Sequence, residues 1–270
     1  MTQTQERTAR TGDKLLGRVA FVTGGTRGIG AAICRSLAAQ GAEVAAGYSG
    51  NQEAAEKFAQ TFTDTFPGRE VTVHRGDIGS ADDCRRCVTE VIDQHGRLDI
   101  LVNNAGITVD RTVAKMVDDD WRRVIDVNLS GAFYLSQAAL KHMLERGSGR
   151  IVMISSVIGE TGGIGQVNYA SAKSGLFGLT KTLAREAAMQ LQRSGVGDGV
   201  GITVNAVTPG YTATEMLDAV PDKVLAGLRA KIPLGRLGQP DDIAQVAVFL
   251  ASDDSGWLTG ERISASGGLR

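Results

Sequence analysis

The hydrophobic positions of the chain follow two alternating patterns. Short apolar runs bounded by glycine or polar residues predict buried strands, and the longer segments between them have the length and pattern of helices. The predicted strands are Val19–Val22, Val44–Ala46, Val71–Val73, Ile100–Val102, Ile151–Ile154, Ile202–Ala206 and Ile263–Ala265. The predicted helices are Ile29–Gln40, Glu53–Phe66, Ala81–Gln94, Asp119–Leu144, Ser171–Gln190 and Asp241–Leu250. Because strands and helices alternate, the pattern predicts an α/β fold of right-handed βαβ units, with a doubly wound parallel sheet covered by helices on both faces.

The N-terminal segment differs from the rest of the chain. Met1–Lys14 is polar, carries both acids and bases and has no apolar segment like that of a secretory signal, so we expect residues 1–16 to form a flexible tail. No later change of composition divides the chain, and residues 17–270 are predicted to form one domain. We expect a cytoplasmic protein, with a weak transit peptide as the alternative.

The cysteines favour neither a disulfide framework nor a metal site. There are three of them, Cys34, Cys84 and Cys87, and an odd number in a long chain argues against the framework of a secreted protein. Cys84 and Cys87 have a spacing that also occurs in zinc sites, but no second pair and no histidine doublet accompanies them. We therefore expect two neighbouring helical positions and no metal.

Composition and charge exclude several functional classes. The chain has 29 Lys and Arg against 30 Asp and Glu, a net charge of −1, so no overall field attracts it to nucleic acid or to an anionic membrane. Hydrophobic residues make up 42%, and no apolar run approaches the roughly 18 residues of a membrane span. The unusual residue is glycine, with 35 copies, which we expect at turns that need special backbone geometry.

A glycine cluster separates the first predicted strand from the first predicted helix. Its sequence is Thr23-Gly24-Gly25-Thr26-Arg27-Gly28-Ile29-Gly30. Glycines at this place let the backbone approach a pyrophosphate, while the free N–H groups at the start of the helix face the anion. The spacing differs from the usual G-x-G-x-x-G, and the alternative is a tight turn without a ligand. Its position between strand and helix favours a dinucleotide site.

The residues after the second strand bear on which dinucleotide binds. An NAD enzyme usually places Asp or Glu there, but this chain has Gly47-Tyr48-Ser49. Arg27 in the glycine loop offers a permanent charge for a 2′-phosphate instead, so the sequence favours NADPH, with a solvated loop charge as the alternative. After the third strand, Asp77-Ile78 is placed to contact adenine, or Asp77 caps the helix that begins near Ser80.

Further polar residues follow the fourth and fifth strands, where ligand sites of open α/β sheets lie. Asn103-Asn104-Ala105-Gly106 is placed to fix a loop over the cofactor, or is simply a turn. Ser156 ends the fifth strand and can hydrogen-bond a substrate carbonyl oxygen. Tyr169 and Lys173 stand at i and i+4 on one helical face, so a lysine cation can favour the ionised form of a tyrosine that transfers a proton. Asn128, in the long predicted helix, can hold a water or irregular backbone open at the site.

These residues carry a resemblance to a known family. The motifs are the glycine cluster, Asn103-Asn104-Ala105-Gly106, Asn128, Ser156, Tyr169-x-x-x-Lys173 and Pro209-Gly210. Together they resemble the short-chain dehydrogenase/reductase family over nearly the whole chain after residue 17. Within it, the chain is most similar to the 3-oxoacyl thioester reductases, of both the acyl-carrier-protein and the acetoacetyl-CoA kinds. The narrower likeness rests on residues 104–110, 165–169, 209–216 and 267–269.

The resemblance implies a Rossmann-type sheet of seven strands and a set of functional residues. Bound NADP(H) would exchange hydride with the 3-oxo carbon, Tyr169 would donate the proton, Ser156 would orient the oxygen, Lys173 would also hold the nicotinamide ribose, and Asn128 would support a proton relay. The implied cofactor-binding residues are Gly24, Thr26, Arg27, Gly28, Ile29, Gly30, Tyr48, Asp77, Ile78, Asn104, Ala105, Gly106, Tyr169, Lys173, Pro209, Gly210, Thr212 and Thr214. The implied substrate residues are Asp110, Ser156, Gln166 and Tyr211.

The resemblance also implies a mobile lid over residues 211–230 and a homotetramer packed through the two long helices. Residues 190–201 form a longer segment than most relatives have, at the end of one of those helices. In carrier-protein reductases, basic residues stand at the positions of Gly147 and Gln190, which favours CoA here unless Arg146, Arg150 or Arg193 substitutes. The alternatives to a thioester reductase are a dehydrogenase of a sugar, steroid or quinone, and a non-catalytic NADP-sensing module.

Overall fold

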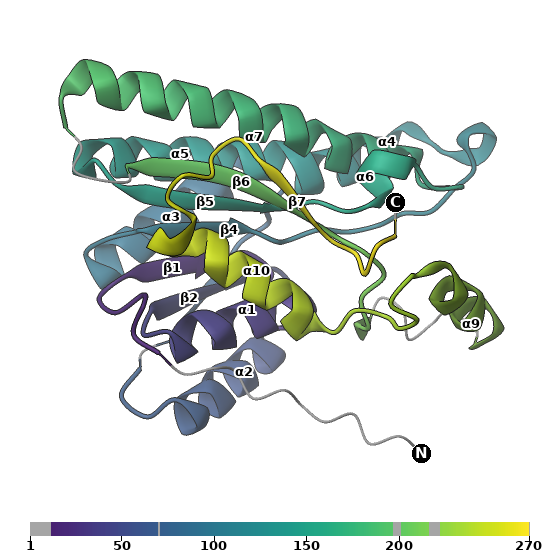
Figure 1. The fold of residues 1–270 in the computed structure, drawn as a ribbon, viewed down its shortest axis with the longest axis horizontal. Coiled ribbons are helices and arrows are strands. Elements are labelled where there is room, and N and C mark those ends of the chain that lie inside the picture. Colours follow the sequence, from purple (N-terminus) through teal and green to yellow (C-terminus); the bar gives the residue numbers. More distant parts are fainter. Residues whose placement is uncertain (1–11, 70, 197–200, 216–221, 270) are drawn as a thin grey trace.

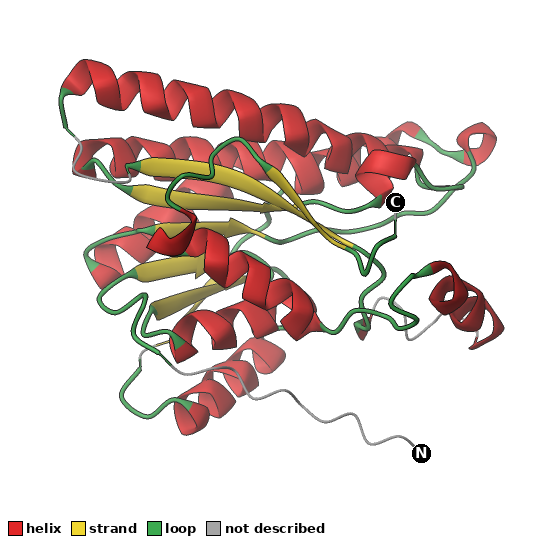
Figure 2. Ribbon diagram, in the orientation of Figure 1, coloured by secondary structure: helices red, strands yellow, loops and turns green. Residues whose placement is uncertain are grey.

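The central sheet has seven parallel strands in the order β3-β2-β1-β4-β5-β6-β7 (Figures 1 and 2). The computed structural model describes residues 12–69, 71–196, 201–215 and 222–269. The strands are β1 (Val19–Val22), β2 (Glu43–Tyr48), β3 (Val71–Arg75), β4 (Ile100–Asn103), β5 (Gly149–Ile154), β6 (Ile202–Pro209) and β7 (Arg262–Ala265). Strand order reverses between β1 and β4, and this is the place where an open α/β sheet binds its ligand.

Helices cover both faces of this sheet. The helices are α1 (Gly28–Ala39), α2 (Gln52–Thr65), α3 (Ala81–His95), α4 (Asp118–Ile125), α5 (Gly131–Arg146), α6 (Ile158–Thr161), α7 (Val167–Ser194), α9 (Asp222–Lys231) and α10 (Pro240–Ala251). In Figure 1, α5 and α7 lie on one side of the sheet, and α1 and α10 lie on the other. The fold confirms the predicted doubly wound α/β architecture.

Side chains of β1 explain why both faces are covered. Ala20 and Val22 belong to the hydrophobic cluster that contains α1, α2 and α10, whereas Val19 and Phe21 belong to the cluster that contains α3, α5 and α7. Successive side chains of a strand point to opposite faces. A run of four apolar residues therefore needs a helical layer on each side, as the continuous hydrophobic pattern of the strand predicts.

The chain is helical throughout the long helix predicted over Asp119–Leu144, but the helix is not a regular α-helix. It consists of α4 and α5, joined by one wide turn of π-helix over Asp126–Ser130. Helix α9 was not predicted, and neither were three shorter elements: α6, a 3₁₀ turn at Val113–Lys115 and another at Asp253–Ser255. The predicted helix over Ser171–Gln190 begins earlier and ends later, as α7.

The segment before β1 is packed where the structure describes it. The amides of Gly12 and Leu15 donate hydrogen bonds to the carbonyls of Ala39 and Gln40, and the side chain of Leu15 is fully buried in the core. Residues 1–11 of the expected tail lie outside the described residues. The packed domain therefore includes residues N-terminal to the expected boundary at residue 17.

The segment predicted as a lid, residues 211–230, is described in part. Residues 211–215 follow β6, α9 covers the end of the segment and stands apart from the sheet in Figure 1, and residues 216–221 lie outside the described part of the chain. The predicted insertion, residues 190–201, begins as a continuation of α7 to Ser194, and residues 197–200 also lie outside the described part.

Candidate active site

The glycine loop between β1 and α1 fits a dinucleotide pyrophosphate. Gly24 and Gly28 have φ values of +62° and +52°, which side-chain-bearing residues rarely adopt. A Cβ on Gly30 would lie 2.1 Å from the carbonyl oxygen of Gly24. Arg27, the N-cap residue of α1, makes no capping hydrogen bond with its side chain in the described structure, and the first turn carries no acid. The first-turn amides of α1 are therefore left to bind an anion.

Asn104 joins this loop to the end of β4. Its side-chain Nδ2 donates to the carbonyl oxygens of Thr23, at 2.8 Å, and Gly24, at 3.2 Å. In return, the Thr23 hydroxyl accepts hydrogen bonds from the backbone amides of Asn104 and Ala105, at 3.0 and 2.9 Å. These four bonds cross the point where strand order reverses. They fix the predicted Asn-Asn-Ala-Gly motif against the glycine loop.

Asn128 lies in the π-helical turn and is buried. Its Nδ2 donates to the carbonyl oxygens of Ile107 and Val124, each at 2.9 Å, while its Oδ1 has no hydrogen-bond partner among the described residues. A Cβ on Gly106 would lie 2.6 Å from this Oδ1 and 3.3 Å from the Nζ of Lys173. The free acceptor and the ammonium thus border the same small space. That geometry suits one water molecule between them.

Ser156, Tyr169 and Lys173 come together at the carboxyl end of β5. Ser156 is the second residue after this strand, and its Oγ accepts a hydrogen bond from the amide of Ile158 at 3.1 Å, while α7 begins two residues before Tyr169. Lys173 lies one turn further along α7, and its Nζ is 5.7 Å from the centre of the Tyr169 ring. It donates to the carbonyl oxygen of Ile154 at 2.8 Å. The structure therefore brings the predicted catalytic residues to one place.

Burial dominates the electrostatics of this cluster. Lys173 is 3% exposed, and burial lowers the pKa of its ammonium to about 8. Burial also raises the pKa of Tyr169, with a hydrogen bond from Ser156 acting in the opposite direction and the charge of Asp110 adding to the rise. The sequence argument emphasised stabilisation of a tyrosine anion by Lys173. In the structure, burial is the largest influence on the phenol and raises its pKa, so the phenol keeps its proton at neutral pH.

Two loops form the rim beside Tyr169. Gln166 Nε2 donates to both carboxylate oxygens of Asp110, at 3.3 and 3.2 Å, so two of the predicted substrate residues bind each other. Asn168, which sequence analysis noted only as part of a motif, is fully buried and ties the same loops together. Its Nδ2 donates to the carbonyls of Val109 and Asp120, and its Oδ1 accepts the amide of Tyr169 at 2.8 Å. Asn168 thus positions the start of α7.

The segment after β6 reaches the glycine loop. Pro209 ends β6, and a Cβ on Gly210 would lie 2.8 Å from the backbone of Ser266. Thr212 then pairs with Gly238 in an isolated bridge, close to Tyr211. Thr214 approaches Gly28, with its methyl carbon 3.6 Å from where a Cβ on that glycine would stand. The predicted residues Pro209, Gly210, Tyr211, Thr212 and Thr214 therefore connect the edge of β6 with the start of α1.

At the other end of the loop, the structure distinguishes two interpretations of Asp77. Its Oδ1 accepts the amide of Gly79 at 2.9 Å and stabilises the turn, whereas the N-cap of α3 is Ser80. Sequence analysis missed Arg75, whose Nε donates to the carbonyl of Ser49 at 3.4 Å beside Tyr48. A hollow of about 380 Å³ adjoins it, lined by Ser49, Arg75, Gly76, Asp77, Asp83 and Arg86. Only the pairing of β2 with β3 brings Arg75 there.

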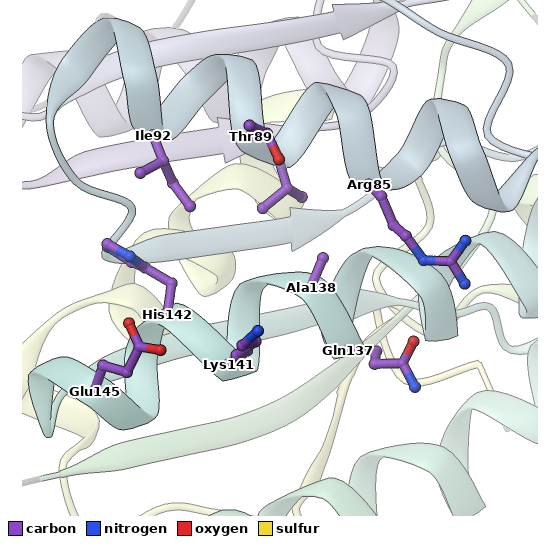
Figure 3. Close-up of a pocket in the computed structure, with 9 residues that line it drawn as sticks. Arg85, Thr89, Ile92, Gln137, Ala138, Lys141, His142 and Glu145 are labelled. Carbon is purple, nitrogen blue, oxygen red and sulfur yellow. The ribbon is translucent and has the colours of Figure 1, made fainter.

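Another hollow, of about 570 Å³, lies between α3 and α5 (Figure 3). Its lining includes Arg85, Thr89, Lys141, His142 and Glu145, and none of the predicted site residues. The predicted site residues therefore lie outside this hollow, at the carboxyl ends of the strands.

The described residues contain neither a metal-binding group nor a helix long and apolar enough to cross a membrane. Among the described residues, no group of three or more His, Cys, Asp or Glu side chains lies close enough together to hold a metal ion. Cys84 and Cys87 are buried, and desolvation raises the pKa of their thiols to about 12 and about 11.

Comparisons with known proteins agree with this geometry. Residues 24–270 match a family model described as enoyl-(acyl carrier protein) reductase. The chain is 48% identical over 254 residues to acetoacetyl-CoA reductase of Rhizobium meliloti strain 1021, covering 94% of this chain and 98% of that protein. It is 42% identical over 250 residues to 3-oxoacyl-[acyl-carrier-protein] reductase FabG of Staphylococcus aureus strain Mu50, covering 93% and 97%.

A solved structure supports the same assignment. A crystal structure described as that of a short-chain alcohol dehydrogenase from Sinorhizobium meliloti 1021 matches with a TM-score of 0.86 at 35% identity, covering 94% of this chain and 97% of that one. The TM-score shows that the two chains share the fold described above. The predicted resemblance is confirmed, and the chain belongs to the short-chain dehydrogenase/reductase family.

Proposed function

We propose that the protein reduces a 3-oxoacyl thioester to the 3-hydroxyacyl thioester with NADPH. The observation that carries the proposal is the cluster of Ser156, Tyr169, Lys173 and Asn128 beside the glycine loop. The names of two relatives, an acetoacetyl-CoA reductase and a 3-oxoacyl-[acyl-carrier-protein] reductase, support the substrate class.

The four residues have distinct parts in this reaction. Ser156 holds the 3-oxo oxygen, and Tyr169, whose raised pKa keeps it protonated, donates a proton to that oxygen. Lys173 binds the nicotinamide ribose and places a positive charge near the phenol as the proton leaves. Asn128 Oδ1 accepts a hydrogen bond from a water molecule, and this water passes a proton toward Lys173. Bound NADPH supplies the hydride for the 3-oxo carbon.

The residues around the ribose end support NADPH rather than NADH. Arg27 presents a guanidinium next to the glycine loop, and no acid follows β2, where it would repel a 2′-phosphate. Arg75 adds a second guanidinium near Ser49. A guanidinium in the glycine loop and another beside the end of β2 favour the cofactor with the additional phosphate.

The burial of one candidate arginine and the residues on the rim of the site support CoA as the carrier of the acyl group. Arg150, one of the arginines that we considered for docking of a carrier protein, is 2% exposed and bound to Asp253, so it is not available for docking. Beside the rim, Ile164 is fully exposed and Arg111 donates its amide to Gly165 at 2.8 Å. An apolar side chain close to one basic residue suits a pantetheine arm that ends in phosphates.

We also propose that the protein is a cytoplasmic homotetramer. The helices expected at the subunit contacts expose apolar side chains, Phe133 on α5 and Met189 on α7, each 40% exposed. Light scattering in solution measures the assembly directly. A monomer would contradict this part of the proposal and leave the reductase assignment intact.

A substrate panel with NADPH tests the function. It contains acetoacetyl-CoA, the same acyl group on acyl carrier protein at low and high salt, crotonyl-CoA, a steroid ketone, a quinone and a ketose. We expect acetoacetyl-CoA to be reduced efficiently, with little gain from the carrier protein at low salt. A carrier-protein advantage that falls as salt rises would overturn the choice of CoA. Preference for another carbonyl class, or for the crotonyl double bond, would overturn the thioester reductase proposal.

A further inference from the structure

Arg27 has a partner that the sequence does not indicate. Its Nη1 lies 3.3 Å from the carboxylate Oε2 of Glu215, which is 188 residues away in the chain. Glu215 follows Thr214, the residue that approaches Gly28. The pair therefore connects the glycine loop with the segment after β6, in the absence of a cofactor.

The guanidinium of Arg27, which we propose binds the 2′-phosphate, is already paired with Glu215 in this structure. Both side chains are largely exposed, 76% for Arg27 and 59% for Glu215, so water screens the attraction between them. A phosphate carries more charge than a carboxylate and accepts two parallel hydrogen bonds from a guanidinium. The 2′-phosphate of NADPH can thus replace Glu215 on Arg27, at the cost of breaking the ion pair.

We propose that Glu215 is a specificity-determining residue that competes with the 2′-phosphate of NADPH for Arg27. The inference rests on the proposed use of NADPH. It makes a prediction that simple charge repulsion does not make. Direct repulsion between the Glu215 carboxylate and the phosphates of the cofactor, including the 2′-phosphate, would persist after removal of Arg27, whereas competition for Arg27 would disappear with that residue.

A double-mutant cycle separates these two effects. The proteins are the wild type, Glu215→Gln, Arg27→Ala and the double variant, and the readout is the dissociation constant of NADPH and of NADH by fluorescence titration without acyl substrate. We expect Glu215→Gln to tighten NADPH about two- to fivefold beyond any change for NADH, as suits an exposed ion pair. In the Arg27→Ala background, Glu215→Gln should change both dissociation constants by the same factor.

A matched control removes an exposed acid elsewhere. Glu53 stands in the first turn of α2 and makes no ion pair with Arg27, so Glu53→Gln should leave the ratio of the two dissociation constants unchanged. Thermal unfolding without cofactor establishes that each variant folds. Equal tightening of NADPH and NADH by Glu215→Gln, or a selective effect that persists without Arg27, would overturn the inference. Failure to reduce acetoacetyl-CoA would instead overturn the proposed function, because the titration contains no substrate.

Discussion

The ammonium of Lys173 lies 5.7 Å from the centre of the Tyr169 ring, one turn away on α7, and Lys173 is buried while Tyr169 is half-buried. Burial moves their pKa values in opposite directions, upward for the phenol and downward to about 8 for the ammonium. Near neutral pH, therefore, the tyrosine holds its proton and the lysine its charge. This is the pair of states that a ketone reductase requires.

The first prediction is the pH dependence of reduction. Because the pKa of Lys173 is about 8, the charged fraction of the ammonium falls as pH rises through that value, while Tyr169 remains protonated. We expect kcat/KM for NADPH to be constant below pH 7 and to fall toward tenfold per pH unit above about 8. Initial rates measured from pH 6 to 10 provide the profile.

A charge-preserving variant serves as the control. Arginine stays protonated over this range, so Lys173→Arg should shift the fall to higher pH even if its rate is lower throughout. An unchanged inflection in this variant would show that Lys173 is not the group that titrates.

The second prediction concerns the glycine loop. Gly30→Ala places a Cβ 2.1 Å from the carbonyl oxygen of Gly24, and backbone cannot yield as a flexible side chain does. We expect a loss of several kcal/mol in unfolding free energy and of NADPH binding. Gly178→Ala, in the interior of α7 with nothing within 4 Å of the new Cβ, should instead gain up to about 1 kcal/mol. Denaturant unfolding and cofactor titration compare the two, and equal behaviour would contradict the packing argument.

The strands and most helices could be predicted because their causes are local. Apolar runs such as Val19–Val22 must be buried on both faces, and Ser80 stands where a helix needs a cap. The motif residues of the site also fall where predicted, since parallel strands end at the same edge of the sheet.

The features that sequence analysis missed depend on contacts between distant parts of the chain. The π-helical turn at Asp126–Ser130 contains no proline or glycine that would mark an interruption, and Asn128 is held there by the carbonyl of Ile107. Glu215 reaches Arg27 across 188 residues, and Arg75 reaches Ser49 only through strand pairing. No local pattern encodes such contacts.

The third prediction is acid destabilisation through His74. Burial lowers the pKa of this side chain, which contacts Thr72 and Phe21 and faces Glu90, His95 and Arg86. Since the unfolded chain then binds more protons than the folded one, stability is complete above pH 6.5 and decreases as pH falls below it. One such group contributes at most about 1.4 kcal/mol per pH unit. Burial also lowers the pKa of His142, which adds in the same direction.

Unfolding free energy measured from pH 7.5 to 5 tests this. His74→Val places a β-branched residue in β3 and removes the titrating group, so the slope of stability against pH should decrease whatever the absolute stability. A slope equal to that of the wild type would assign the acid sensitivity to other groups.

Substitution of Tyr169 by phenylalanine tests the central claim most directly, because it removes only the proton donor. Steady-state reduction of acetoacetyl-CoA by NADPH is measured for wild type and Tyr169→Phe, together with NADPH binding and thermal unfolding of both. The account predicts efficient turnover by the wild type and a loss of about 10²- to 10⁴-fold in the variant, with NADPH affinity and folding retained. Turnover by Tyr169→Phe within a few-fold of the wild type would contradict it.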